Sequence, residues 1–126
     1  MKYFIESDLK GFNQNSITNA SRGNKFYANK MKKEMQYEII MCFRSQHIKK
    51  IETPCKIIAT WDVKDKRMDL DNLMLKNVLD ALQDIDMIEN DNMNHIKEIH
   101  HSFVVDVDKE KQGLEIEFLG VGENEL

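Results

Sequence analysis

The sequence is poor in the residues that build disulfide scaffolds, collagen-like chains or membrane spans. Its 126 residues include two cysteines, one proline and five glycines, and no apolar run approaches the roughly 20 residues that cross a bilayer. Cys42 and Cys55 match no disulfide framework or metal-binding spacing, so we expect reduced thiols in the core of a cytoplasmic protein. The first residues reach acid too early for a signal peptide, and we expect no membrane partner.

The remaining composition is typical of one globular domain, with 41% hydrophobic and 32% charged residues. We therefore expect a single domain over residues 1–126. The net charge of −4 hides an asymmetry, because residues 1–67 carry 14 basic and 7 acidic side chains whereas residues 68–126 carry 4 and 15. This distribution suits a protein that binds a polyanion through one surface and cations through another. Chance and ordinary solvated faces are the alternative explanation.

Hydrophobic periodicity predicts a two-layer α+β domain, in which two helices pack against a mixed β-sheet. Met31, Met35 and Ile39 recur at the spacing of a helix, whereas residues 55–63 alternate as in a strand buried on one face. The last two strands, joined by a turn that ends in glycine, are expected to form a hairpin. The expected order is β-α-β-α-β-β: strand 2–7, helix 25–50, strand 55–63, a helix with Leu75, Val78, Leu79, Leu82 and Ile85 on its apolar face, and strands 95–107 and 114–120.

Two carboxylates stand close together before the second helix, in the segment "RMDLDNLMLKNVLDAL" at 67–82. One of them could cap the helix, but Asp69 and Asp71 both point the same way on an extended chain, where two like charges are unfavourable without a cation. Hard oxygen donors at this spacing suit Mg²⁺ or Mn²⁺. Asp91, in the acidic loop 86–94, is a candidate third ligand. The alternative is a solvated turn.

Lys76 follows one turn into the same helix, four residues before Asp80. These two side chains could form an ordinary surface ion pair, which contributes a few tenths of a kcal/mol. Beside metal-bound carboxylates, however, a lysine would contact the phosphate of a polyanionic substrate and stabilise the charge that develops on it. The sequence has no Gly-rich phosphate loop, EF-hand pattern, paired zinc ligands or activated Ser or Cys nucleophile.

The segment "RMDLDNLMLKNVLDALQDIDMIENDNMNHI" resembles the core of the RusA-type Holliday junction resolvases, a family found in phages and prophages. Asp69, Asp71 and Asn72 match the Asp-x-Asp-Asn element of that family, residues 79–82 match its Leu-Asp-Ala-Leu element, and Asp91 falls where its last metal-binding acid belongs. The resemblance extends thinly over the rest of the chain, through a polar loop and a basic first helix.

The sequence departs from the family pattern at two positions. Lys76 lies one residue further from Asn72 than the common spacing of the family lysine, and Asn90 stands where an acid often precedes the last aspartate. The resemblance implies a Mg²⁺-dependent homodimeric endonuclease, with Mn²⁺ as a possible substitute, that cuts four-way DNA junctions by paired symmetric nicks in recombination and repair, in the bacterial cytoplasm or nucleoid.

The implied residues fall into three groups. Asp69, Asp71 and Asp91 would bind the metal, Lys76 would assist catalysis, and Asn72 and Asp80 would support them. The phosphates of branched DNA would contact Arg22, Lys25, Lys30, Lys32, Lys33, Lys64, Lys66 and Arg67. Two other functions stay open: a metal nuclease that acts on flaps, forks or other branched DNA, and a catalytically silent DNA-binding or phage assembly protein of the same fold.

Overall fold

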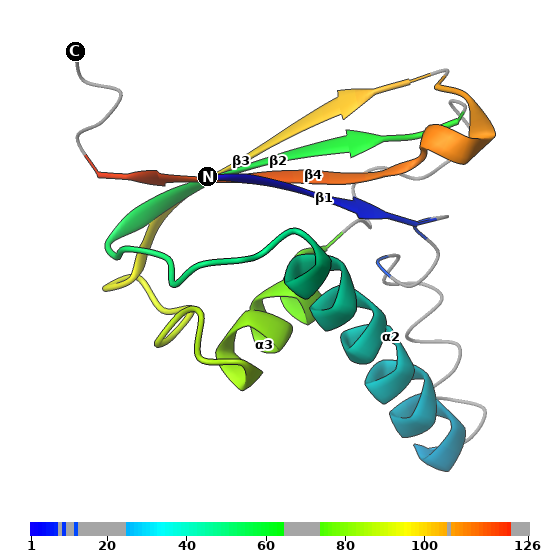
Figure 1. Cartoon of the computed structure of the whole chain (residues 1–126), viewed down its shortest axis with the longest axis horizontal. Helices are drawn as coiled ribbons and strands as arrows, with labels where there is room; N and C mark the ends of the chain where they lie inside the picture. Colours follow the sequence, from blue (N-terminus) through cyan, green and yellow to red (C-terminus); the bar gives the residue numbers. More distant parts are fainter. Residues whose placement is uncertain (8, 10–11, 13–24, 65–73, 106, 122–126) are drawn as a thin grey trace.

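The molecule has two layers, with both helices on one face of a four-stranded sheet (Figure 1). The structure is a computed structural model that describes residues 1–7, 9, 12, 25–64, 74–105 and 107–121. This arrangement confirms the predicted α+β fold and the element order. The elements are β1 (Lys2–Glu6), α2 (Lys25–Ser45), β2 (Cys55–Asp62), α3 (Lys76–Asp84), β3 (Ile96–Val104), a 3-10 turn (Lys109–Lys111) and β4 (Gly113–Gly120).

Helix α2 packs on the sheet through the apolar stripe that its sequence predicts. Ile39 and Phe43 are buried and Met35 is half-buried. The ring of Phe43 meets the ring of Tyr3 on β1 edge to face, at 5.6 Å between centroids. The helix then ends in a left-handed residue, His47, with φ of 57°, and the amide of Ile48 donates to the carbonyl of Phe43. Such an ending satisfies the last carbonyls and turns the chain away.

Strand β2 lies inside the sheet, between β4 and β3. Its alternate residues Cys55, Ile57, Ala59 and Trp61 are buried beneath the helices, which confirms the alternation predicted for this segment. Burial raises the pKa of the Cys55 thiol, and both cysteines are free. No helix in the described part of the chain is long and apolar enough to cross a membrane.

The predicted hairpin of the last two strands is wrong. The order across the sheet is β1-β4-β2-β3, so β4 lies between β1 and β2 and is antiparallel to both, whereas β3 is parallel to β2 at the edge. Burial explains the difference: Leu114, Ile116 and Phe118 of β4 are all buried, and a position between two strands covers them. β3 has one buried residue, Ile96, and can therefore stay at the edge.

Helix α3 returns the chain from the end of β2 toward the start of β3. Its buried residues are Asn77, Val78, Leu79, Ala81 and Leu82, and Leu75 before it is also buried, in agreement with the predicted apolar face. The helix ends as α2 does, because Asp86 is left-handed with φ of 58° and the amide of Met87 donates to the carbonyl of Leu82. The loop that follows leads into β3.

Candidate functional site

The site predicted from the sequence falls partly outside the described residues. The predicted site residues outside the described part of the chain are Arg22, Lys66, Arg67, Asp69, Asp71 and Asn72. The side chain of Lys25, at the start of α2, also lies outside it. The structure places Lys76, Asp80 and Asp91, together with the lysines of α2 and Lys64 after β2. The functional interpretation below is based on the arrangement of these described residues.

Lys76 is the first residue of α3, and its side chain is exposed. The first turn of the helix contains no acidic residue, and Leu75 at the N-cap supplies no side-chain hydrogen bond. The positive dipole end of a helix favours an anion at such a terminus. The ion pair with Asp80 that the sequence allowed is not among the ion pairs of the described residues. Lys76 thus adds a cation to a terminus that already favours negative charge.

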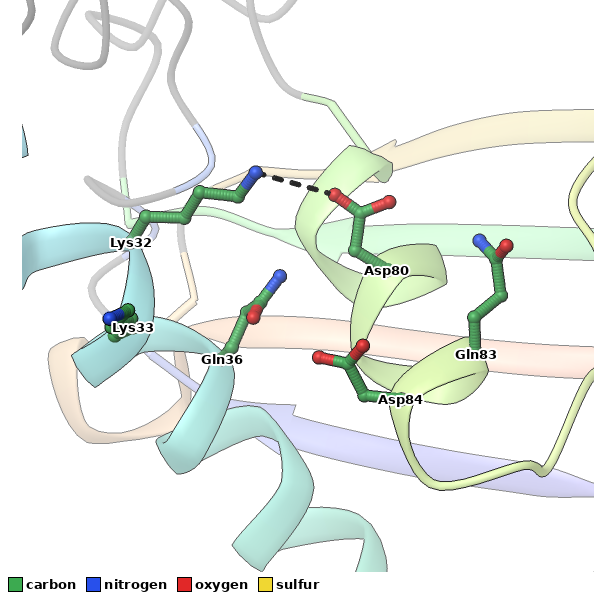
Figure 2. A pocket seen from close by; sticks show the side chains of 6 residues that line it. All are labelled: Lys32, Lys33, Gln36, Asp80, Gln83 and Asp84. Carbon is green, nitrogen blue, oxygen red and sulfur yellow. Dashed lines mark ion pairs between the residues drawn. The ribbon is translucent and has the colours of Figure 1, made fainter. Parts of the chain in front are cut away.

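Asp80 pairs with the other helix instead. Its carboxylate Oδ2 lies 3.8 Å from Nζ of Lys32 on α2, and Figure 2 shows the lysine side chain extending across from α2 to α3. The two helices border an open groove of about 570 Å³ at this place. The lining residues are Lys32, Lys33 and Gln36 from α2 and Asp80, Gln83 and Asp84 from α3.

The groove runs along the same face of α3 as Lys76. Lys76, Asp80 and Asp84 are spaced by four residues, which places them in one row on a helix. A ligand in the groove would therefore meet two lysines of α2 on one side and a row that leads toward Lys76 on the other. Gln83 and Asp84 were not among the predicted site residues, although the spacing of four from Asp80 to Asp84 was a usable signal.

Asp91 lies beyond the other end of α3 and is exposed. The helix of nine residues is about 13 Å long, so it separates Lys76 from the loop that carries Asp91. That loop is held by asparagine side chains: Asn90 accepts from the amide of Asn92, and Asn92 accepts from the amide of Asn94. The carboxylate of Asp91 is thus available to a ligand while its backbone is fixed.

No group of three or more His, Cys, Asp or Glu side chains within metal-binding reach occurs among the described residues. The candidate donors are nevertheless all carboxylates, and such hard oxygen ligands fit Mg²⁺ or Mn²⁺ rather than a soft metal. The predicted ligands Asp69 and Asp71 lie between Lys64 and Met74, in the segment that joins β2 to α3. The chemistry of the predicted donor set therefore fits magnesium.

Comparison with known proteins adds no family assignment. No protein-family model matches the sequence. No curated protein matches it either. The likeness to RusA-type resolvases is a prediction from the motifs, and the function is inferred from the residues and their arrangement.

The open face of the sheet is acidic, which bears on where a polyanion can approach. Five carboxylates and two lysines alternate with the buried positions of the four strands: Glu6, Asp62, Glu98, Glu115, Glu117, Lys2 and Lys56. Lys2 pairs with Glu115 at 3.0 Å and Lys56 with Glu98 at 3.0 Å, so both lysines are already neutralised. Burial, followed by repulsion from Glu115, raises the pKa of Asp62.

The helical layer carries both charges, and its basic side chains are concentrated on α2. Lys30, Lys32, Lys33 and Arg44 are exposed on α2, against Glu34 and Glu38. Lys30 lies 4.0 Å from Glu34 in a spacing of four, which is a weak, solvated pair. Across the groove Lys32 and Lys33 face Asp80 and Asp84, so the basic side chains that a polyanion would meet lie on α2 rather than on the open face of the sheet.

Proposed function

We propose that this protein is a Mg²⁺-dependent, structure-specific endodeoxyribonuclease that resolves four-way DNA junctions by paired nicks in opposite strands. It would act as a homodimer in DNA recombination and repair, in the cytoplasm of a bacterial host. The proposal rests on the carboxylate motif in the sequence, and it is supported by the charge and placement of the described side chains.

The structural observation that best supports the proposal is the position of Lys76. This exposed cation begins α3, shortly after the segment that contains Asp69 and Asp71, and the first turn of α3 has no acidic residue. A phosphate held there would lie beside the two carboxylates in sequence and in line with the groove of Lys32 and Lys33. The alternative role of Lys76, an ion pair with Asp80 on the same helix, is not supported, because Asp80 pairs with Lys32 of α2.

The residues of the chain would divide the work as follows. Asp69, Asp71 and Asp91 would hold the metal, which when bound supplies Lewis-acid activation of water and of the scissile phosphate. Lys76 would position the phosphate and stabilise the charge that develops on its oxygens. Lys30, Lys32, Lys33 and Lys64 would hold the flanking phosphates, which fixes register without reading sequence.

The homodimer follows from the symmetry of the substrate. A four-way junction is nearly twofold symmetric, and a closed twofold dimer presents two identical sites to it. Each of the two identical sites then cuts one of the two opposite strands. A monomer would release a singly nicked junction.

A cleavage assay tests the proposal and separates it from its rivals. A mobile four-way junction, a flap and a plain duplex are each incubated with the protein in Mg²⁺, Ca²⁺ or EDTA. Paired symmetric nicks in the junction with Mg²⁺ alone are expected. Preference for the flap would indicate a nuclease of other branched DNA, and binding without nicking in any divalent ion would indicate a silent DNA-binding protein; either result would contradict the proposal.

A further inference from the structure

The two edge strands of the sheet are β1 and β3 (Figure 1). They differ in whether a side chain binds the outward backbone groups. The outer edge of β1 is closed by a side chain. Gln46, just after α2, accepts from the amide of Phe4 at 2.8 Å and donates to its carbonyl at 2.6 Å. A glutamine that binds both backbone groups of one residue occupies the place of a neighbouring strand, so another chain cannot pair there.

Among the described residues, no side chain closes the edge of β3 in this way. Among the described residues β2 is its single neighbouring strand, and eight of its nine residues are exposed. Monomeric proteins usually protect an edge strand with charged side chains, proline or a bulge. β3 has Lys97 and Glu98 near its beginning, but residues 99–104 read "IHHSFV" and contain no lysine, carboxylate or proline. The irregularity in the pairing of β3 with β2 lies at its beginning, between the partners of Cys55 and Lys56.

The backbone groups that face this open edge can be identified. The carbonyl of Val104 accepts from the amide of Val63 and so points toward β2. Because the two backbone groups of a strand residue point to one side and alternate along the strand, those of Glu98, His100 and Ser102 also face β2. The amides and carbonyls of Ile99, His101 and Phe103 therefore face outward.

The side chains of the same three residues lie on the helix-facing side of the sheet. Ile99, His101 and Phe103 are opposite Ile57, Ala59 and Trp61 of β2, which are fully buried. Ile99 and Phe103 nevertheless remain 44% and 40% exposed, since the helices do not extend over this edge. Within the described part of the chain, the margin of the core is thus exposed at the same edge where the backbone has no strand partner.

We propose that β3 pairs antiparallel with β3 of a second copy of this chain, about a twofold axis at His101, to form one continuous eight-stranded sheet. Ile99 then lies opposite Phe103 of the other copy on both sides of the axis, and His101 faces its own counterpart. All three outward residues exchange backbone hydrogen bonds with the other copy, roughly six in total. Ile99 and Phe103, which are partly exposed in the monomer, are each covered by an apolar partner.

The strand itself favours a second copy over a different protein. It is self-complementary about His101, with apolar residues two positions away on each side and the polar residues His100 and Ser102 at one position away. No charge meets its like in this register, since Glu98 faces Val104 of the other copy. A twofold axis at His100 instead would place Phe103 opposite Lys97, and an odd offset would put inward-facing backbone groups against outward-facing ones.

The inference rests on the homodimer of the proposed function but not on its nuclease activity. A monomeric protein would overturn both, whereas a dimer that forms through another surface would overturn the inference alone. Sedimentation equilibrium across the micromolar range measures the mass of the wild-type protein and of two variants. Ile99→Lys places a charge within the proposed interface, and Met41→Lys makes the same kind of change at a residue on α2 that is 46% exposed. Circular dichroism checks that both variants keep the fold.

The expected result is a wild-type dimer, an unchanged dimer for Met41→Lys, and a dissociation constant raised at least about tenfold for Ile99→Lys. A monomeric wild-type protein would overturn the inference. A dimer as tight for Ile99→Lys as for the wild type would also overturn it, because the interface would then lie elsewhere.

Cross-linking tests the register directly. The double variant Ile99→Cys/Phe103→Cys places a cysteine of each copy opposite one of the other and is expected to give a covalent dimer on oxidation. The two new cysteines are about 13 Å apart within one strand, too far to join to each other. Either single variant should stay monomeric on a denaturing gel. Covalent dimer from a single variant, or none from the double variant, would contradict this register.

Discussion

Lys32 and Asp80 join the two helices across the groove, with 3.8 Å between Nζ and Oδ2. The lysine side chain is about half exposed and the aspartate about a quarter, so solvent screens the pair and its contribution to stability is below about 1 kcal/mol. Such a pair can be exchanged for a stronger partner at little cost. A phosphate in the groove would provide one, and the competition between Asp80 and the phosphate can be measured.

Asp80→Asn is expected to strengthen junction binding, because it frees Lys32 and removes one negative charge from the groove. The salt dependence should steepen by about one unit in the slope of log K against log salt, as for one additional phosphate contact. Fluorescence anisotropy with a labelled junction at several salt concentrations measures both. Asp86→Asn makes the same charge change in an exposed loop outside the groove and should leave the slope unchanged. Weaker binding by Asp80→Asn would contradict this account of the groove.

Lys76→Ala is expected to lower the rate of junction cleavage by about 10²-fold, since it removes a cation from beside the scissile phosphate. Junction affinity should change little. Single-turnover cleavage and anisotropy separate the two effects. Lys111→Ala, at an exposed lysine of the 3-10 turn, is the matched control and should cleave normally. Wild-type cleavage by Lys76→Ala would mean that this lysine has no part in catalysis.

His101 and Trp61 predict a pH dependence. The indole Nε1 donates to Nδ1 of His101 at 3.0 Å and the rings stack, so the imidazole accepts a hydrogen bond and is neutral. Burial lowers the pKa of His101 from 6.5. The unfolded chain therefore binds more protons just below pH 6.5, and this contribution to stability, fully present above that pH, is lost as the pH falls through the folded pKa.

The fluorescence of Trp61, the one tryptophan in the chain, reports this titration, because a protonated imidazole quenches a stacked indole. The expected midpoint lies below pH 6.5. His101→Asn should abolish the transition, whereas His100→Asn, on the other face of β3, should preserve it. A transition that survives in His101→Asn would show that another group is responsible.

Gln46→Ala is expected to lower the free energy of unfolding by about 1–3 kcal/mol, because the amide and carbonyl of Phe4 both lose their partner. Urea denaturation measures the change. Gln36→Ala, on an α2 position that lines the groove, should change stability by less than about 0.5 kcal/mol. Equal stabilities for Gln46→Ala and the wild type would mean that water replaces the glutamine at no cost.

The fold was predictable where the local pattern determines burial. The four-residue spacing of Met35 and Ile39 and the alternation from Cys55 to Trp61 record which face each element buries, and the structure agrees. The pairing of β4 was not predictable in this way. A strand that follows another after a short turn usually pairs with it, but Leu114, Ile116 and Phe118 are buried between strands from earlier in the chain.

The candidate site divides in the same way. The motif around Asp69 and Asp71 can be read from spacing alone, since it is contiguous. The partner of Asp80 could not, because Lys32 belongs to a different helix and is brought close by packing. The local alternative, a pair with Lys76 one turn away, was the more obvious one in the sequence. Tertiary contacts also determine which sheet edge Gln46 closes, and no local pattern records that choice.

The most direct test of the account compares Asp71→Asn with the wild-type protein on a four-way junction in Mg²⁺. Cleavage and binding are measured on the same labelled substrate. The account predicts paired nicks by the wild type, and no cleavage by Asp71→Asn although it binds the junction at least as tightly, because loss of one negative charge eases the approach of the phosphates. Full cleavage by Asp71→Asn, or a wild-type protein that binds the junction and never nicks it, would contradict it.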